Sequence, residues 1–124
     1  MRLILLLAVM AWSVTVTIDT KYRSVLDLTN GKSATIEESS RFFVEVDKGV
    51  FTHTIPSMTS VYYITDTVRT FNLLKNGIVA MPVKSDAGNH YLYVFDFVNG
   101  RIMAYPSTGE FILEFDIIDS RLDE

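Results

Sequence analysis

Tyrosine side chains are the residues of this sequence best suited to binding. Five of them fall in three stretches expected to be neighbours in a sheet: Tyr62, Tyr63, Tyr91, Tyr93 and Tyr105. A tyrosine ring offers a flat apolar surface and a hydroxyl group, so a sheet face lined with such rings can stack on sugars or hold an extended peptide. The competing and more common arrangement is a tyrosine-rich core with hydroxyl groups at its rim. The sequence predicts these five residues as its ligand-binding residues.

Three carboxylates are the candidates for acid–base chemistry. Glu114 and Asp116 are two residues apart in an expected strand, so both project from one face. Paired carboxylates can hydrolyse a glycosidic bond. Asp96 stands among apolar neighbours. The alternative is the solvent face of a half-exposed strand, with the apolar residues at 111, 113, 115 and 117 directed inward, and the sequence favours that alternative.

Metal and nucleophile chemistry has little support in the sequence. His53 and His90 are isolated, and histidines of this kind are more often surface or hydrogen-bonded side chains than ligands or bases. Asp86 and Asn89 could offer oxygens to calcium, but a turn that uses these side chains explains them equally well. The chain has neither a zinc-protease motif nor a nucleophile elbow nor a glycine-rich phosphate loop. We expect no catalytic residue, no cofactor and no metal site.

Composition limits the class of partner. The 124 residues suffice for one domain with its own core. A formal net charge of −4, with basic residues scattered along the chain, argues against nucleic acid, which requires a clustered basic surface. The absence of cysteine excludes disulfides and thiolate chemistry. The expected partner is therefore a small ligand or another protein.

The first residues have the pattern of an export signal. Arg2 is followed by the apolar run Leu3–Met10, and Ala11 and Ser13 are small residues at the spacing of a cleavage site. We therefore predict a signal peptide over residues 1–13, a single all-β domain over residues 14–124, and a secreted or periplasmic protein. A buried first element and a membrane anchor are the alternatives. The run is short for an anchor, so we expect no stable membrane span in the mature chain.

The rest of the chain alternates apolar and polar residues between turns, which is typical of β-strands. We predict an antiparallel meander of about eight to ten short strands that forms a barrel or a sandwich. One short helix near 66–76 is an alternative to a strand there. The polar residues 37–40 are expected to form a loop. Asn30-Gly31 and Asn99-Gly100 are expected to form two-residue type I′ hairpin turns.

The second of these turns fixes an expected register. A two-residue loop at Asn99-Gly100 would pair Phe97 with Ile102 and Phe95 with Ala104. Those four residues would then share one apolar face with Tyr93, and this face should meet the core.

Taken together, these patterns predict a small exported, non-catalytic β protein. It would bind a ligand or a protein partner through a sheet face or the mouth of a barrel. One alternative is a structural or assembly subunit that pairs with other chains through exposed strand edges. A less favoured alternative is a hydrolase that uses Asp96, Glu114 or Asp116.

Overall fold

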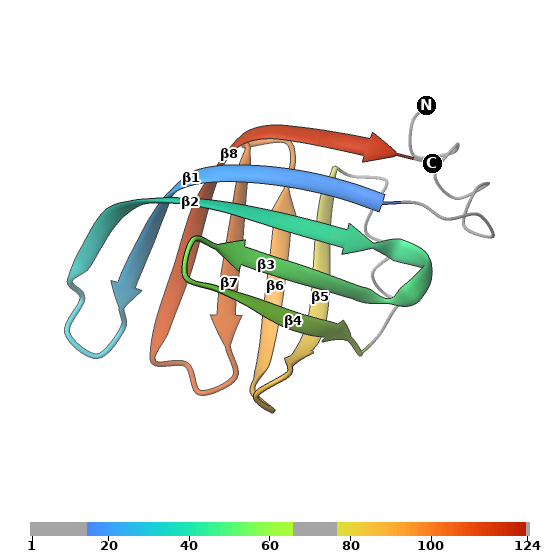
Figure 1. The fold of residues 1–124 in the computed structure, drawn as a ribbon. Helices are drawn as coiled ribbons and strands as arrows, with labels where there is room; N and C mark the ends of the chain where they lie inside the picture. The colour runs from blue at the N-terminus through green and yellow to red at the C-terminus, as the bar shows by residue number, and fades with distance from the viewer. Residues whose placement is uncertain (1–14, 66–76, 124) are drawn as a thin grey trace.

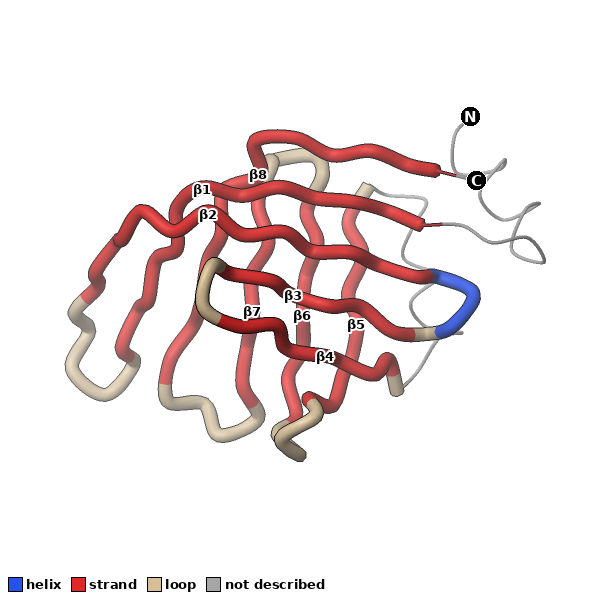
Figure 2. Tube along the Cα trace, in the orientation of Figure 1, coloured by secondary structure: helices blue, strands red, loops and turns tan. Residues whose placement is uncertain are grey.

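The computed structural model describes residues 15–65 and 77–123, and these fold into a closed β-barrel. Its strands are β1 (Thr15–Asp27), β2 (Ser33–Glu45), β3 (Val50–Ile55), β4 (Met58–Ile64), β5 (Ile78–Ser85), β6 (His90–Asp96), β7 (Arg101–Pro106) and β8 (Phe111–Asp123). One 3₁₀ turn, Val46–Lys48, joins β2 to β3 (Figure 2). The predicted all-β antiparallel fold is confirmed. The predicted signal peptide and the possible helix near 66–76 lie outside the described residues.

Each strand pairs in antiparallel fashion with the next, and β8 returns to pair with β1. Figure 1 shows two layers whose strands cross steeply: β3 and β4 belong to one layer, and β5, β6 and β7 to the other. β1, β2 and β8 are each 13 residues long and pass from one layer to the other. The register of β1 shifts next to Thr20 against both neighbours, and such bulges bend a strand. The bulges therefore let three long strands serve both layers.

The interior of the barrel is a packed aromatic core. Alternate residues of every strand point inward, as period-2 alternation requires. The buried hydrophobic residues are Ile18, Phe42, Val44, Phe51, Tyr62, Val79, Met81, Val83, Tyr93, Phe95, Ile102, Ala104 and Phe115. Their rings meet largely edge to face, for example Phe42 with Phe115 at 5.2 Å and Phe51 with Tyr93 at 5.0 Å between centroids. The predicted inward direction of Phe95 and Phe115 is confirmed.

The turn between β6 and β7 differs from the predicted type I′ turn. That turn needs a positive φ at both central residues, but among the described residues only glycines have positive φ, Gly100 included. The loop instead spans residues 97–100, and Asp96 closes it by accepting hydrogen bonds from the main-chain N–H groups of Val98 at 3.1 Å and Asn99 at 3.0 Å. Asn99 also donates its side-chain amide to Asp96 at 2.8 Å.

This longer loop displaces the register between β6 and β7 by two residues from the predicted one. Phe95 pairs with Ile102 and Tyr93 pairs with Ala104, so the expected pairing of Phe95 with Ala104 is wrong. The shift preserves the face, and those four residues are still buried together. Phe97 is the exception, because it lies in the loop and is 40% exposed.

The turn between β1 and β2 departs from its prediction in the same way. Residues 28–32 form the loop, and Asp27 accepts hydrogen bonds from the main-chain N–H of Thr29 at 2.9 Å and from its hydroxyl group. Asn30 does not have positive φ, so the predicted type I′ turn is wrong here too. Residues 37–40, expected to be a loop, belong to β2 instead.

Candidate functional site

The five predicted tyrosines separate into two groups. Tyr62, Tyr91 and Tyr93 point into the same end of the barrel, where their rings lie 5.1 to 5.9 Å apart. Tyr93 is 1% exposed and Tyr62 is 9% exposed, so both are core residues. Tyr63 lies on the outer surface and is 53% exposed, and Tyr105 is partly exposed on the outside of β7.

Burial keeps the two inner phenols neutral. Desolvation raises the pKa of Tyr93 and that of Tyr62 above the ordinary value of a phenol. The two hydroxyl groups share a hydrogen bond, which partly offsets the rise in the pKa of Tyr62. These hydroxyls therefore satisfy each other within the core. Of the other three predicted tyrosines, Tyr63 is exposed, and Tyr91 and Tyr105 are half-buried.

Tyr91 and Tyr105 both line an open hollow of about 380 Å³ on the wall formed by β5, β6 and β7, which we call the tyrosine depression. Tyr105 faces it from the outside of β7, whereas the ring of Tyr91 packs on Tyr62 and Tyr93. Its lining residues are Thr65, Pro82, Val83, His90, Tyr91, Leu92, Tyr105, Pro106 and Ser107. The volume lies within the range of small-molecule sites, roughly 300–1,000 Å³. The depression thus gathers two of the predicted tyrosines, together with His90, from the adjacent strands β6 and β7.

Strand register explains why this surface is apolar. Pro82 pairs with Leu92, and Leu92 pairs with Tyr105, so the three side chains form a row across β5, β6 and β7. Thr65 closes one end by donating its hydroxyl group to the carbonyl of Pro82 at 3.0 Å. Lysine, arginine, aspartate and glutamate are all missing from the residues that line the depression. Its polar groups are the hydroxyls, the His90 ring and the main chain.

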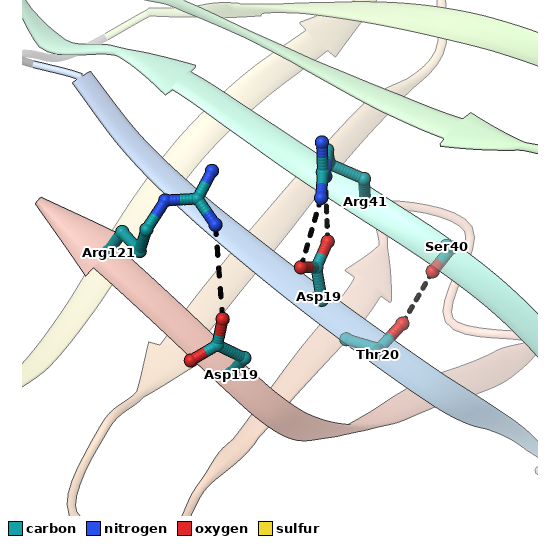
Figure 3. Close-up of polar contacts among 6 residues, drawn as sticks. All are labelled: Asp19, Thr20, Ser40, Arg41, Asp119 and Arg121. Atoms are coloured by element: carbon teal, nitrogen blue, oxygen red, sulfur yellow. Dashed lines mark hydrogen bonds and ion pairs between the residues drawn. The ribbon is translucent and has the colours of Figure 1, made fainter. Parts of the chain in front are cut away.

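A second open hollow, of about 400 Å³, lies where β1 bends against β2 and β8. Figure 3 shows its polar wall, in which Arg41 donates to both carboxylate oxygens of Asp19, at 2.7 and 3.1 Å. This pair lowers the pKa of Asp19 through the hydrogen bond and the charge of Arg41. The hydroxyls of Thr20 and Ser40 are hydrogen bonded to each other beside it. These polar groups already have partners, so the second hollow is the weaker candidate for a ligand.

A polar cluster inside the barrel was missed by the sequence predictions. Arg23 on β1 lies 3.6 Å from Glu38 on β2, measured from Nε to Oε1. Both atoms, and Nε2 of His53 on β3, are shielded from solvent without a hydrogen-bond partner. The His53 ring stacks on Phe42 with centroids 4.0 Å apart. Burial, assisted by the charge of Arg23, lowers the pKa of His53 to about 4, so the ring is neutral at neutral pH.

The sequence offered no signal for this cluster. Arg23, Glu38 and His53 lie in three different strands, and none belongs to a motif. Only the register of β1 and β2, with its bulge at Thr20, brings Arg23 and Glu38 together.

The three candidate carboxylates surround one arginine on the outer face. Asp96 and Asp116 are the direct partners of Arg101 in neighbouring strands, and Glu114 lies 3.9 Å from its guanidinium. Hydrogen bonds from Asn99 lower the pKa of Asp96, the direction opposite to that of a general acid. Asp96 serves here as the acceptor that closes the loop.

Residues 86–89, for which the sequence left calcium binding and a turn as alternatives, form a turn in this structure. The Ser85 hydroxyl accepts a hydrogen bond from the main-chain N–H of Asn89 at 3.1 Å, and Gly88 takes a positive φ of 92°. Within residues 15–65 and 77–123, no three histidine or acidic side chains gather as a metal site would require.

The described residues also contain no helix with the length and apolar character of a membrane span.

Comparison with protein-family models, with curated proteins and with solved structures finds no match. Any functional conclusion therefore rests on the geometry described above.

Proposed function

We propose that the protein is a non-catalytic binding protein that takes a small neutral ligand in the tyrosine depression. The observation that carries the proposal is the row of Pro82, Leu92 and Tyr105, an apolar strip with hydroxyl groups and the His90 ring around it. The strip suits a ligand with one flat apolar face, and the polar groups suit hydroxyls at its edge. Sugars have this combination of surfaces.

Charge supports a neutral ligand over an ionic one. An ionised ligand is normally bound by side chains of opposite charge, and the depression offers none. The packed core also supports an outer site over an interior one, because aromatic rings occupy the middle of the barrel. The depression lies on a sheet face, which is one of the two locations predicted from the sequence.

The test is a titration of isotope-labelled protein with neutral sugars, for example N-acetylglucosamine and cellobiose, followed by nuclear magnetic resonance. Amide signals of residues around Tyr105 and His90 should shift in a saturable manner. Tyr105→Ala removes the ring from the depression and should weaken binding at least about tenfold, as the loss of a stacking aromatic residue does.

Tyr63→Ala is the matched control, since Tyr63 is also an outward tyrosine but does not line the depression. It should leave the affinity unchanged. Shifts that map to another surface, equal losses in the two variants, or no saturable shift with any neutral sugar would each overturn the proposal.

We also propose that the protein is exported, to the periplasm or beyond the cell. Support comes from the pattern of residues 1–13 and from a cysteine-free composition compatible with an oxidising compartment. Amino-terminal sequencing of protein purified from its native host should find a start after residue 13. Protein that begins at Met1 would contradict export by a cleaved signal.

A further inference from the structure

The first half of β2 has a free edge. Residues 33–40 pair with β1 on one side, whereas pairing with β3 covers only Arg41–Glu45. Within the described part of the chain, no main-chain hydrogen bond reaches the other side of residues 33–40. Figure 1 shows this half of β2 and its partner in β1 leaving the layer of β3 and β4 as a projecting hairpin. The barrel is thus closed through β1 and β8, but its wall ends at this edge.

The direction of the edge groups follows from one hydrogen bond. The N–H of Asp27 donates to the carbonyl of Lys32 at 2.8 Å, so this pair is hydrogen bonded across the hairpin. Hydrogen-bonded pairs alternate along an antiparallel ladder, so Ala34 and Ile36 also direct their main-chain groups at β1. Ser33, Thr35 and Glu37 therefore direct their N–H and C=O groups outward, where another strand can accept them.

We propose that the β2 edge of one molecule pairs in antiparallel fashion with the β2 edge of a second copy, about a two-fold axis at Thr35. This arrangement makes one continuous sheet through two barrels. It is independent of the tyrosine depression, which lies on β5, β6 and β7. A two-fold contact uses the same surface on both molecules and closes at the dimer.

Charge selects this register. With the axis at Thr35, Lys32 of each copy lies opposite Glu38 of the other, whose carboxylate also faces Arg23 of its own chain. Glu37 lies opposite the uncharged Ser33. Opposite charges directly across a ladder attract, whereas like charges there repel. Moving the axis to Glu37 would place two Glu37 side chains face to face. The register at Thr35 also sets Ile36, which is 45% exposed, against Ala34 of the other copy.

The chain has another free edge that is less suited to pairing. Among the described strands, residues 118–123 of β8 pair only with β1, since the β7 register ends at Asp116. That edge carries Asp119, Arg121 and Asp123 at alternate positions, and charged residues of this kind protect strand edges from association. Residues 33–36 of β2 carry no charge. The comparison favours β2 as the edge that pairs.

A cysteine substitution tests the axis directly, because the chain contains no cysteine of its own. At the proposed axis the two Thr35 residues form a hydrogen-bonded pair, in which the Cα atoms lie about 5.5 Å apart. A disulfide can span this distance. Thr35→Cys should therefore give a covalent dimer under mild oxidation. Ser120→Cys, on the β8 edge, is the matched control and should cross-link much more slowly. Preferential cross-linking of Ser120→Cys, or equal slow rates, would overturn the proposal.

Charge exchange tests the register without a covalent bond. Analytical ultracentrifugation should show a concentration-dependent dimer, and Lys32→Glu should weaken it at least about tenfold by creating two like-charge contacts. Mixing Lys32→Glu protein with Glu38→Lys protein should restore a mixed dimer. Thr35→Pro removes the central edge N–H and no main-chain hydrogen bond to β1, although it also removes the hydroxyl contact with Ser24. It should abolish pairing while circular dichroism still reports a folded barrel. A wild-type protein that stays monomeric up to ~1 mM would refute the proposal.

Discussion

At the scale of single residues, His53 is a titratable side chain packed between aromatic rings. Its ring lies nearly parallel to Phe42, at an interplanar angle of 7°, and edge-on to Phe115 at 5.1 Å. A charged ring would lose hydration there and would face the positive charge of Arg23. The fold therefore requires the neutral imidazole.

This requirement makes stability depend on pH in a definite window. The pKa of His53 falls from 6.5 in the unfolded chain to about 4 in the fold. Between these values the unfolded chain binds a proton that the folded chain does not. The contribution of neutral His53 to the free energy of unfolding is therefore fully present above pH 6.5 and decreases as the pH falls towards 4. The slope from this residue is at most about 1.4 kcal/mol per pH unit. His53→Phe should remove it, as measured by urea unfolding at several pH values between 4.5 and 7.5.

The carboxylates provide an internal check on that measurement. Asp19, Asp27 and Asp96 have pKa values lowered from 3.8, so most of their contribution is lost only at more acidic pH. Wild-type and His53→Phe proteins with the same slope between pH 4.5 and 6.5 would show that the imidazole is not the source.

At the scale of elements, one turn recurs in the chain. The sequences Asp27-Leu28-Thr29-Asn30-Gly31-Lys32 and Asp96-Phe97-Val98-Asn99-Gly100-Arg101 share an aspartate, an Asn-Gly pair and a basic residue at equal spacing. In both, the aspartate accepts the N–H two residues ahead and the glycine takes positive φ, 73° and 70°. The Asn-Gly pair correctly marked the turns. The aspartate three residues before each Asn-Gly pair sets the length of the loop. The predictions did not take this aspartate into account.

The left-handed glycine in this turn is open to a direct test. A Cβ atom at Gly100 would meet nothing within 4 Å, so a substitution there acts through the backbone conformation alone. Gly100→Val should destabilise the protein by ~1–3 kcal/mol, because a β-branched residue is strained at positive φ. Gly100→Asn is the matched control, since asparagine tolerates this conformation, and it should lose less. Thermal melts with equal midpoints for both variants would contradict this explanation.

At the scale of the whole molecule, alternation alone was enough to predict an antiparallel β fold with its apolar face inward. Phe95 and Phe115 are buried as alternation requires, because a step of two residues preserves the face even when the register is displaced. The closure of β1 on β8 and the bend at Thr20 depend on contacts between distant parts of the chain. No local pattern reports such contacts. For the same reason the sequence could indicate tyrosines as candidate binding residues, but it could not predict which of them point into the barrel and which point outward.

The pairing of β1 with β8 also affects the order in which the molecule can be completed during synthesis. β1 leaves the ribosome first, while its partner begins only at Phe111, near the far end of the described chain. Residues Thr15 to Asp27 of β1 pair with β8 in the finished barrel. Until β8 emerges, that edge of β1 has no partner strand. The growing chain thus carries a second uncovered strand edge that the finished barrel has lost, so the nascent protein is more prone to association than the mature one.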